Sequence, residues 1–309
     1  MIKKIAVVIF SFNRPADLRA TIESWKVNAN WADIYIYDDD SDNKEQLDYL
    51  DFIIKNNIVK KVWKSDLSNS GDVKSRGGLY LNMQRAYQSL NEMGVEYMLF
   101  TQDDIQLVRS LSSEDVSLLT SAFQTYKNIG QIDLRFSTSS VDSKFSKRGC
   151  IVDQKIRIAI PGKNSDEVYD YFAAVGLMSI ERYAGVHWLF AESEVANCIQ
   201  SKKIGLYRAQ CVDPFMMHTP WPTTFKRRKK NLILLFTEFI YNHGFYPYEY
   251  MSQSKIEQLL SRREDNFASA MTWLTLKNNN LPSGVWNFCG ADRKVRRIAF
   301  KIKVFLLRK

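Results

Sequence analysis

Two short acidic runs carry the residues most suited to chemistry. DDDSDN occupies residues 38–43 and QDD occupies residues 102–104, and each run follows an apolar stretch with the pattern of a buried strand. Carboxylates held close together repel one another, so such a run is most favourable where a cation or a polar ligand offsets its charge. Asp103 and Asp104 are therefore candidates for holding a hard divalent ion such as Mg²⁺ or Mn²⁺. The alternative is that both acids only cap the turn that follows.

The elements that must position these acids follow from the apolar pattern. The first hundred residues alternate strand-like and helix-like stretches, which predicts an α/β domain with a largely parallel sheet flanked by helices. Strands are expected at Lys4–Phe12, Ile34–Tyr37, Val59–Trp63 and Tyr97–Thr101, and helices from Pro15, around Leu47–Ile54 and over Leu79–Met93. Ligands of open α/β sheets gather beyond the carboxyl ends of the strands. The acidic runs after the second and fourth strands should therefore face one crevice.

The second half of the chain is less regular. Ser112 or Ser113 is a suitable cap for a helix, and residues 173–180 have the pattern of a small-residue strand. A helix is expected to end near Lys202, with the next strand at residues 204–207. No internal repeat is apparent.

Cysteine spacing, charge distribution and missing glycine motifs limit the classes of function that the chain can have. The four cysteines are scattered without metal-ligand spacing, which predicts reduced thiols in a cytosolic protein, and no stretch reaches the roughly 18 apolar residues of a membrane span. The net charge is +9, but residues 226–230 hold five cations and residues 293–309 hold eight, which leaves 30 basic residues against 34 acids elsewhere. Basicity therefore belongs to two patches, and a nucleic-acid partner is not expected. The dinucleotide, P-loop and nucleophile-elbow glycine motifs are all absent from the sequence.

Four stretches together resemble the glycosyltransferases of the GT-A fold, particularly the large family 2 group. These are IAVVIFSFNRP at 5–15, IYIYDDDSDN at 34–43, SGDVKSRGG at 70–78 and YMLFTQDDIQL at 97–107. The resemblance covers roughly residues 4–220 and implies a metal-dependent transferase that uses a nucleotide-sugar donor. It assigns donor contacts to a set of residues drawn from these stretches: Phe12, Asn13, Arg14, Asp38, Asp39, Arg76, Gln102 and Asp103. Asp38 takes the position that contacts the base.

The same resemblance places the metal and the catalytic base. Gln102-Asp103-Asp104 stands where the family has D-x-D, and the last acid, Asp104, is the expected metal ligand. The neutral Gln102 departs from that motif and supplies no charge. His218 lies where several families have a further metal ligand, although a lone histidine is also often structural. Counting back from Gly205 brings the base to Glu194 and, as second choice, Glu192, and the alternative is that both glutamates only start a helix.

The two basic patches suggest where the enzyme works. Residues 293–309 read RKVRRIAFKIKVFLLRK, an apolar helical face among cations that is typical of a helix in a membrane interface. A packed helix or a nucleic-acid contact would be the alternatives. We therefore expect a GT-A domain over residues 1–220 and an extension over 221–309 whose basic and apolar helices lie at an anionic membrane surface or on the acceptor side. The expected function is inverting transfer to a lipid-linked glycan acceptor at the cytoplasmic face of the membrane. A retaining transferase, or a homologue that binds nucleotide or glycan without catalysis, remains the alternative.

Overall fold

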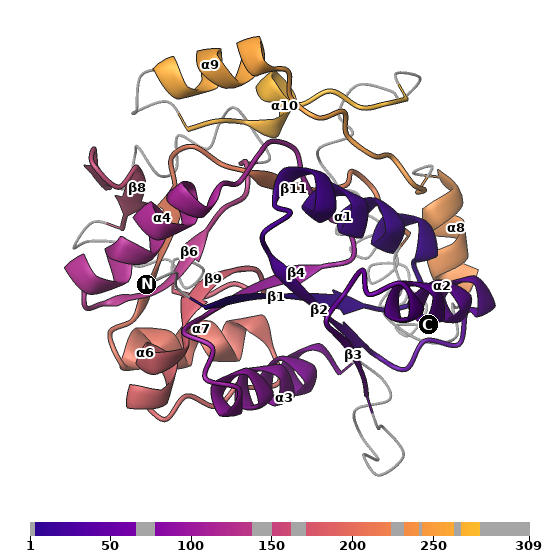
Figure 1. The fold of residues 1–309 in the computed structure, drawn as a ribbon, viewed down its shortest axis with the longest axis horizontal. Helices are drawn as coiled ribbons and strands as arrows, with labels where there is room; N and C mark the ends of the chain where they lie inside the picture. The colour runs from indigo at the N-terminus through magenta and orange to yellow at the C-terminus, as the bar shows by residue number, and fades with distance from the viewer. Residues whose placement is uncertain are drawn as a thin grey trace, which may run out of the picture.

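A computed structural model describes residues 4–65, 78–137, 150–161, 171–223, 232–240, 243–262 and 267–278 of the chain (Figure 1). Three of the sequence predictions concern residues outside these ranges. They are the donor contact of Arg76, the basic cluster at 226–230 and the basic helix at 293–309.

The N-terminal part alternates strands and helices as the apolar pattern predicts. The elements are β1 (Ile5–Ser11), α1 (Pro15–Asn28), β2 (Asp33–Asp38), α2 (Lys44–Lys55), β3 (Lys61–Lys64), α3 (Leu79–Glu92) and β4 (Tyr97–Gln102). Pro15 is the first residue of α1, where its missing N–H costs nothing. The Asn43 side chain caps α2 by accepting a hydrogen bond from the backbone N–H of Gln46.

The second half contains shorter elements. They are β5 (Ile105–Leu107), α4 (Ser113–Thr125), β6 (Ile129–Asp133), β7 (Ile151–Asp153), β8 (Ile158–Ile160), β9 (Gly176–Ser179), α6 (Ile180–Gly185), α7 (Glu194–Lys203), β10 (Tyr207–Cys211), β11 (Met216–His218), α8 (Leu232–Ile240), α9 (Gln253–Ser261) and α10 (Ala270–Trp273). Ser112 is the cap of α4 and forms a capping box with Asp115. The strand predicted at residues 204–207 is wrong, because Gly205 has a φ of +75° in a turn and β10 begins only at Tyr207.

The described residues form one sheet of nine strands in the order β3-β2-β1-β4-β9-β6-β10-β8-β7. The block β3-β2-β1-β4 is parallel throughout, as is the pair β6 and β10. β9 lies antiparallel between β4 and β6, so β6 and β10 run in the same direction as β4. The α/β class with a large central sheet flanked by helices is confirmed, and its parallel pairing is concentrated in these two blocks.

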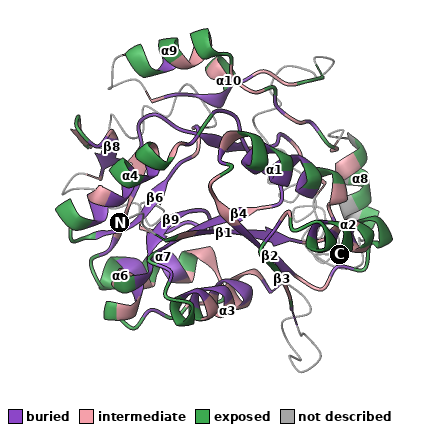
Figure 2. Cartoon of the chain, viewed as in Figure 1, coloured by how far each residue is buried: buried purple, intermediate pink, exposed green. Residues whose placement is uncertain are grey.

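Each face of the sheet carries its own hydrophobic cluster. α1, α2 and α4 cover one face, where Trp25 and Leu50 are fully buried, and α3, α6 and α7 cover the other, where Trp188 is buried. Figure 2 shows the sheet as a buried layer between helices whose outer surfaces are exposed. Burial of each such large side chain contributes about 1.5–3 kcal/mol to the free energy of folding, so the two clusters stabilise the sheet from both faces.

A small second sheet lies against this body. β11 pairs antiparallel with β5, and a third hydrophobic cluster joins Val108 and Met217 to Tyr248 and Leu259. Residues from both sides of the predicted boundary at residue 220 therefore share one cluster. None of the described helices is long and apolar enough to cross a membrane.

Candidate active site

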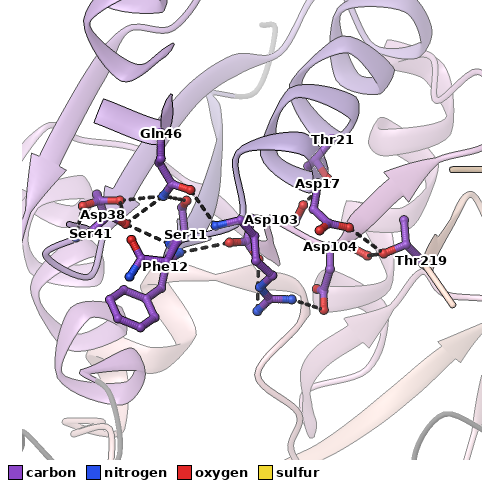
Figure 3. Close-up of polar contacts among 12 residues, drawn as sticks. Ser11, Phe12, Asp17, Thr21, Asp38, Ser41, Gln46, Asp103, Asp104 and Thr219 are labelled. Carbon is purple, nitrogen blue, oxygen red and sulfur yellow. Dashed lines mark hydrogen bonds and ion pairs between the residues drawn. The ribbon is translucent and has the colours of Figure 1, made fainter. Parts of the chain in front are cut away.

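The turn that follows β1 lies between the carboxyl ends of β2 and β4. The backbone N–H of Phe12 donates to Asp103 Oδ2 at 2.9 Å (Figure 3). The N–H of Asp39 donates to the carbonyl of Ser11 at 2.9 Å. From α1, the Thr21 hydroxyl donates to the carbonyl of Asp103 at 2.7 Å. The two acidic runs therefore meet at one edge of the sheet, as the strand pattern predicts.

Asp38 is the centre of a buried polar network. The residue is 1% exposed, and its carboxylate accepts hydrogen bonds from the Ser41 N–H at 2.8 Å, the Ser41 hydroxyl at 2.7 Å and Gln46 Nε2 at 3.0 Å. Gln46 Nε2 also lies 2.7 Å from Ser11 Oγ, and Gln46 Oε1 accepts from the backbone N–H of Arg14 at 2.7 Å. These bonds hold the turns after β1 and β2 together. A contact of Asp38 with a nucleotide base stays a prediction, and the described contacts show the carboxylate engaged in shaping the site.

Asp39 fixes the start of α3. Its carboxylate accepts from the backbone N–H of Gly78 at 2.8 Å, from Asn82 Nδ2 at 2.9 Å and from the Ser65 hydroxyl at 3.1 Å. Burial raises the pKa of Asp39, and the bonds from Gly78 and Asn82 oppose that rise. A Cβ atom at position 78 would lie 2.6 Å from Asp39 Oδ1, so a larger residue there would have to displace that carboxylate. The glycine pair at 77–78 was a weak signal in the sequence, and the role of Gly78 is visible only in the structure.

Asn13 and Phe12 complete the turn after β1. Asn13 has a φ of 50° and is 5% exposed. Its side-chain oxygen accepts from the backbone N–H groups of Asp42 and Asn43, each at 3.0 Å, so Asn13 also joins the two turns. Phe12 is half-buried, and Figure 3 shows its ring projecting away from the polar network. Such a ring is suited to stack on a planar ligand.

Arg14 bridges the acid pair at the end of β4. Its Nη1 lies 2.7 Å from Asp104 Oδ2 and its Nη2 lies 3.2 Å from Asp103 Oδ1. Asp103 is 1% exposed and Asp104 is 4% exposed, whereas the Arg14 side chain is 18% exposed. A buried carboxylate pair needs a compensating cation. In the described structure that cation is the guanidinium of Arg14.

The surroundings shift the pKa values of Asp103 and Asp104 in opposite directions. Burial raises the pKa of Asp103 to about 7, although Arg14 opposes the rise. Burial also acts to raise the pKa of Asp104, but the charge of Arg14 and its hydrogen bond to Asp104 outweigh burial, so the pKa is lowered. Asp104 therefore stays ionised at neutral pH, while Asp103 can hold a proton there.

Asp17 and His218 complete the cluster. Asp17, in the first turn of α1, is 4% exposed, accepts from the Thr219 hydroxyl at 3.1 Å, and has its pKa raised by burial to about 7. The backbone N–H of Thr219 donates to the carbonyl of Asp104 at 2.7 Å, which places the neighbouring His218 beside Asp104. Burial lowers the pKa of His218 to about 4, so its imidazole is neutral at pH 7. Sequence reasoning missed Asp17, because an acid in the first turn of a helix is explained by the helix dipole alone.

The residues present fit a divalent ion that is held jointly with a ligand. Across the described ranges, no group of three or more His, Cys, Asp or Glu side chains is arranged to hold a metal. Asp104 Oδ1 is buried without a hydrogen-bond partner, and the neutral imidazole of His218 is in the protonation state that binds metals. One oxygen and one nitrogen are too few for a closed site, so further ligands would have to come from donor phosphates.

The two candidate bases lie at the start of α7. Glu194 is its first residue and half-buried, Ser193 caps the helix, and Glu192 is exposed. Because α7 leads into β10, which starts at the opposite edge of the sheet, the first turn of α7 lies toward the edge of the acid pair. Glu194 also contributes to the raised pKa of Tyr80, next to the first residue of α3. No hydrogen bond or ion pair among the described residues joins either glutamate to Asp103 or Asp104.

Gln102, the neutral member of the run, is the last residue of β4 and is half-buried. It pairs with Phe10 of β1, so it lies on the edge that carries the acid pair.

Comparison with known proteins gives matches among solved structures. No protein-family model and no curated protein sequence matches the chain. The chain is similar to S. aureus TarS, with 13% identity and a TM-score of 0.47 over 84% of this chain and 42% of TarS, so it spans less than half of that protein. It is similar to the mannosyltransferase PcManGT from Pyrobaculum calidifontis, solved with GDP-Man and Mn²⁺, with 8% identity and a TM-score of 0.44 over 79% of this chain and 66% of PcManGT. It is also similar to GalNAc-T7 solved with UDP, GalNAc and Mn²⁺, with 11% identity and a TM-score of 0.48 over 88% of this chain and 56% of that one.

Proposed function

We propose that this chain is a glycosyltransferase of the GT-A kind, which moves a sugar from a nucleotide-sugar donor to a glycan acceptor. The observation that carries the proposal is the buried Asp103–Asp104 pair with Arg14 across it and His218 beside it, at the edge where the parallel strands β2, β1 and β4 end. Ligands of such sheets bind at that edge. The order of motifs along the sequence supports the same function.

The charges of the site favour a diphosphate donor that binds together with a cation. Three buried acids, Asp17, Asp103 and Asp104, surround one guanidinium, so the site has more acidic than basic side chains. A nucleoside diphosphate would add further negative charge. Asp104 and His218 would hold a divalent ion, which when bound offsets charge on the departing diphosphate. The planar guanidinium of Arg14 is suited to donate hydrogen bonds to the phosphate oxygens of the donor.

Transfer itself needs a base for the acceptor hydroxyl. In our proposal the Glu194 carboxylate takes the hydroxyl proton while the acceptor oxygen bonds to the anomeric carbon and the bond to the diphosphate oxygen breaks. A single displacement of this kind inverts the anomeric configuration. The position of Glu194 at the start of α7, toward the edge of the acid pair, supports this role, and Glu192 is the second choice.

The acceptor is proposed to be lipid-linked and the enzyme to work at the cytoplasmic face of a membrane. Support comes from composition, because residues 226–230 and 293–309 hold 13 of the 43 basic residues without an acid. Cations near an anionic lipid surface contribute about 1 kcal/mol each.

Release of nucleoside diphosphate from a panel of nucleotide sugars tests the proposal directly. The full chain should hydrolyse or transfer one donor in the presence of Mn²⁺, and activity should be lost with a chelator or in Asp104→Asn. Asp33→Asn is the matched control, because Asp33 is the first residue of β2 and lies at the opposite edge of the same sheet. Equal metal dependence in Asp104→Asn and the parent protein would contradict the proposed metal ligand. No turnover with any donor would contradict the enzyme.

A second candidate is a protein that binds a nucleotide sugar without turning it over. Gln102 removes one charge from the metal motif, and Arg14 already pairs with Asp104, which favours this candidate. The same panel discriminates the two, because a binder would be stabilised thermally by one donor and release no diphosphate.

A further inference from the structure

α8 presents its apolar stripe to solvent. Leu232, Leu235, Phe236 and Phe239 are 83%, 47%, 62% and 84% exposed. Their spacing of three, four and seven residues places them on one face of the helix. A stripe with this spacing usually packs against a core, and large apolar surfaces left open mark interaction sites. Figure 2 shows α8 at the periphery of the molecule with exposed residues along it.

The segment that contains α8 starts and ends beside the candidate active site. The backbone N–H of Gly244 donates to the carbonyl of Trp221 at 2.9 Å, so the chain leaves and returns at one point. Trp221 follows Thr219 by two residues, and the backbone N–H of Thr219 donates to the carbonyl of Asp104 at 2.7 Å. A surface that binds α8 is therefore held near the edge of the sheet where the donor is proposed to bind.

The sequence around α8 says which kind of partner suits the stripe. Residues 226–230 read KRRKK, and from there through the end of α8 the only acid is Glu238. A second copy of the chain would bring the same five cations to this face. The C-terminal stretch at 293–309 would bring eight more. Both would add repulsion, so the complementary partner is anionic and apolar at once, which describes an anionic lipid surface.

We propose that α8 is an interfacial membrane helix. Its four exposed apolar side chains enter the boundary between the head groups and acyl chains of an anionic membrane. The inference deepens the membrane part of the proposed function by naming the surface. Its test does not require sugar transfer, so the two can fail separately.

The experiment measures binding of the full chain to phosphatidylcholine vesicles with and without phosphatidylglycerol. The parent protein should sediment with the anionic vesicles, and binding should weaken with salt without vanishing. Phe236→Gln combined with Phe239→Gln should lower the partition coefficient about tenfold or more, because two exposed rings no longer enter the lipid. Phe52→Gln combined with Leu189→Gln is the matched control, since these side chains are 52% and 65% exposed and lie in α2 and in the loop before α7. Hydrogen exchange at residues 232–240 should slow when vesicles are added.

Several outcomes overturn the inference. Equal sedimentation of both double variants would assign any membrane binding to another segment. A lowered melting temperature of the α8 variant would show that the stripe is packed within the protein. A change in its oligomeric state without lipid would show that a second copy covers the stripe. Diphosphate release from a soluble donor should be the same in both variants, so this reading reports separately on the proposed enzyme.

Discussion

Arg14→Gln removes the cation that pairs with both acids at the end of β4, the only one among the residues that the structure describes. In the folded protein Asp103 and Asp104 are at most 4% exposed, and the guanidinium lies 2.7 Å from Asp104 and 3.2 Å from Asp103. Glutamine keeps a polar group of similar reach but supplies no charge. The change therefore leaves two buried carboxyls without a counter-ion in a site that already holds Asp17.

The expected loss of stability is large. Breaking a buried ion pair by removing one partner costs roughly 3–5 kcal/mol, and protonation of the carboxyls limits that cost. Because the pKa of Asp103 is already raised to about 7, we expect the lower end, about 3 kcal/mol at pH 8. For a domain of this size that is a fall in melting temperature of about 5–10 °C. The fall should shrink toward pH 5, where protonated carboxyls need no counter-ion.

Thermal unfolding of the variant, with and without Mn²⁺, measures both consequences. Mn²⁺ alone should stabilise Arg14→Gln more than the parent protein, because the ion no longer competes with the guanidinium for Asp104. Nucleoside diphosphate added together with Mn²⁺ should stabilise Arg14→Gln less than it stabilises the parent protein, because the variant lacks the contact between Arg14 and phosphate. Arg19→Gln is the control on the same helix, because Arg19 is half exposed and lies 3.5 Å from the exposed Glu45. A melting temperature within about 2 °C of the parent at pH 8 would refute the counter-ion role.

Three further predictions follow from the same site. Glu194→Gln should lower kcat about a hundredfold or more with donor affinity nearly unchanged, and if steady-state kinetics show this pattern for Glu192→Gln instead, the base is Glu192. The pKa of Asp17 in the folded protein is raised to about 7, so ionisation of Asp17 lowers the stability of the fold as the pH rises from about 4 to about 7. Asp17→Asn should therefore raise the melting temperature at pH 8 and leave it unchanged at pH 5. A melting-temperature difference that does not depend on pH would contradict this. Gln46→Ala should cost about 2–4 kcal/mol in chemical denaturation, because Asp38 and Ser11 lose a buried donor, and a loss below about 1 kcal/mol would show that the network is not needed.

The alternating apolar pattern was sufficient to place the parallel half of the fold. β1, β2, β3 and β4 lie where the pattern predicts, because each is a short β-branched or aromatic run bounded by turn residues or by a helix start. The convergence of the acidic runs also followed from the sequence, since parallel neighbours end at one edge. The start of β10 did not, because the turn at Gly205 depends on a backbone conformation that the apolar pattern does not report.

Charge pairing in the site was decided by tertiary structure. Arg14 and Asp104 are ninety residues apart in the chain, and Asp17 and Thr219 more than two hundred. The sequence determined which residues carry charge and which strands they follow. Packing of α1 across the sheet edge decided that Arg14 is the counter-ion of Asp104 and that Asp17 is buried beside it. Burial likewise decided that four apolar side chains of α8 face solvent, because the apolar run at 232–241 leaves open whether its side chains meet a core, a lipid surface or water.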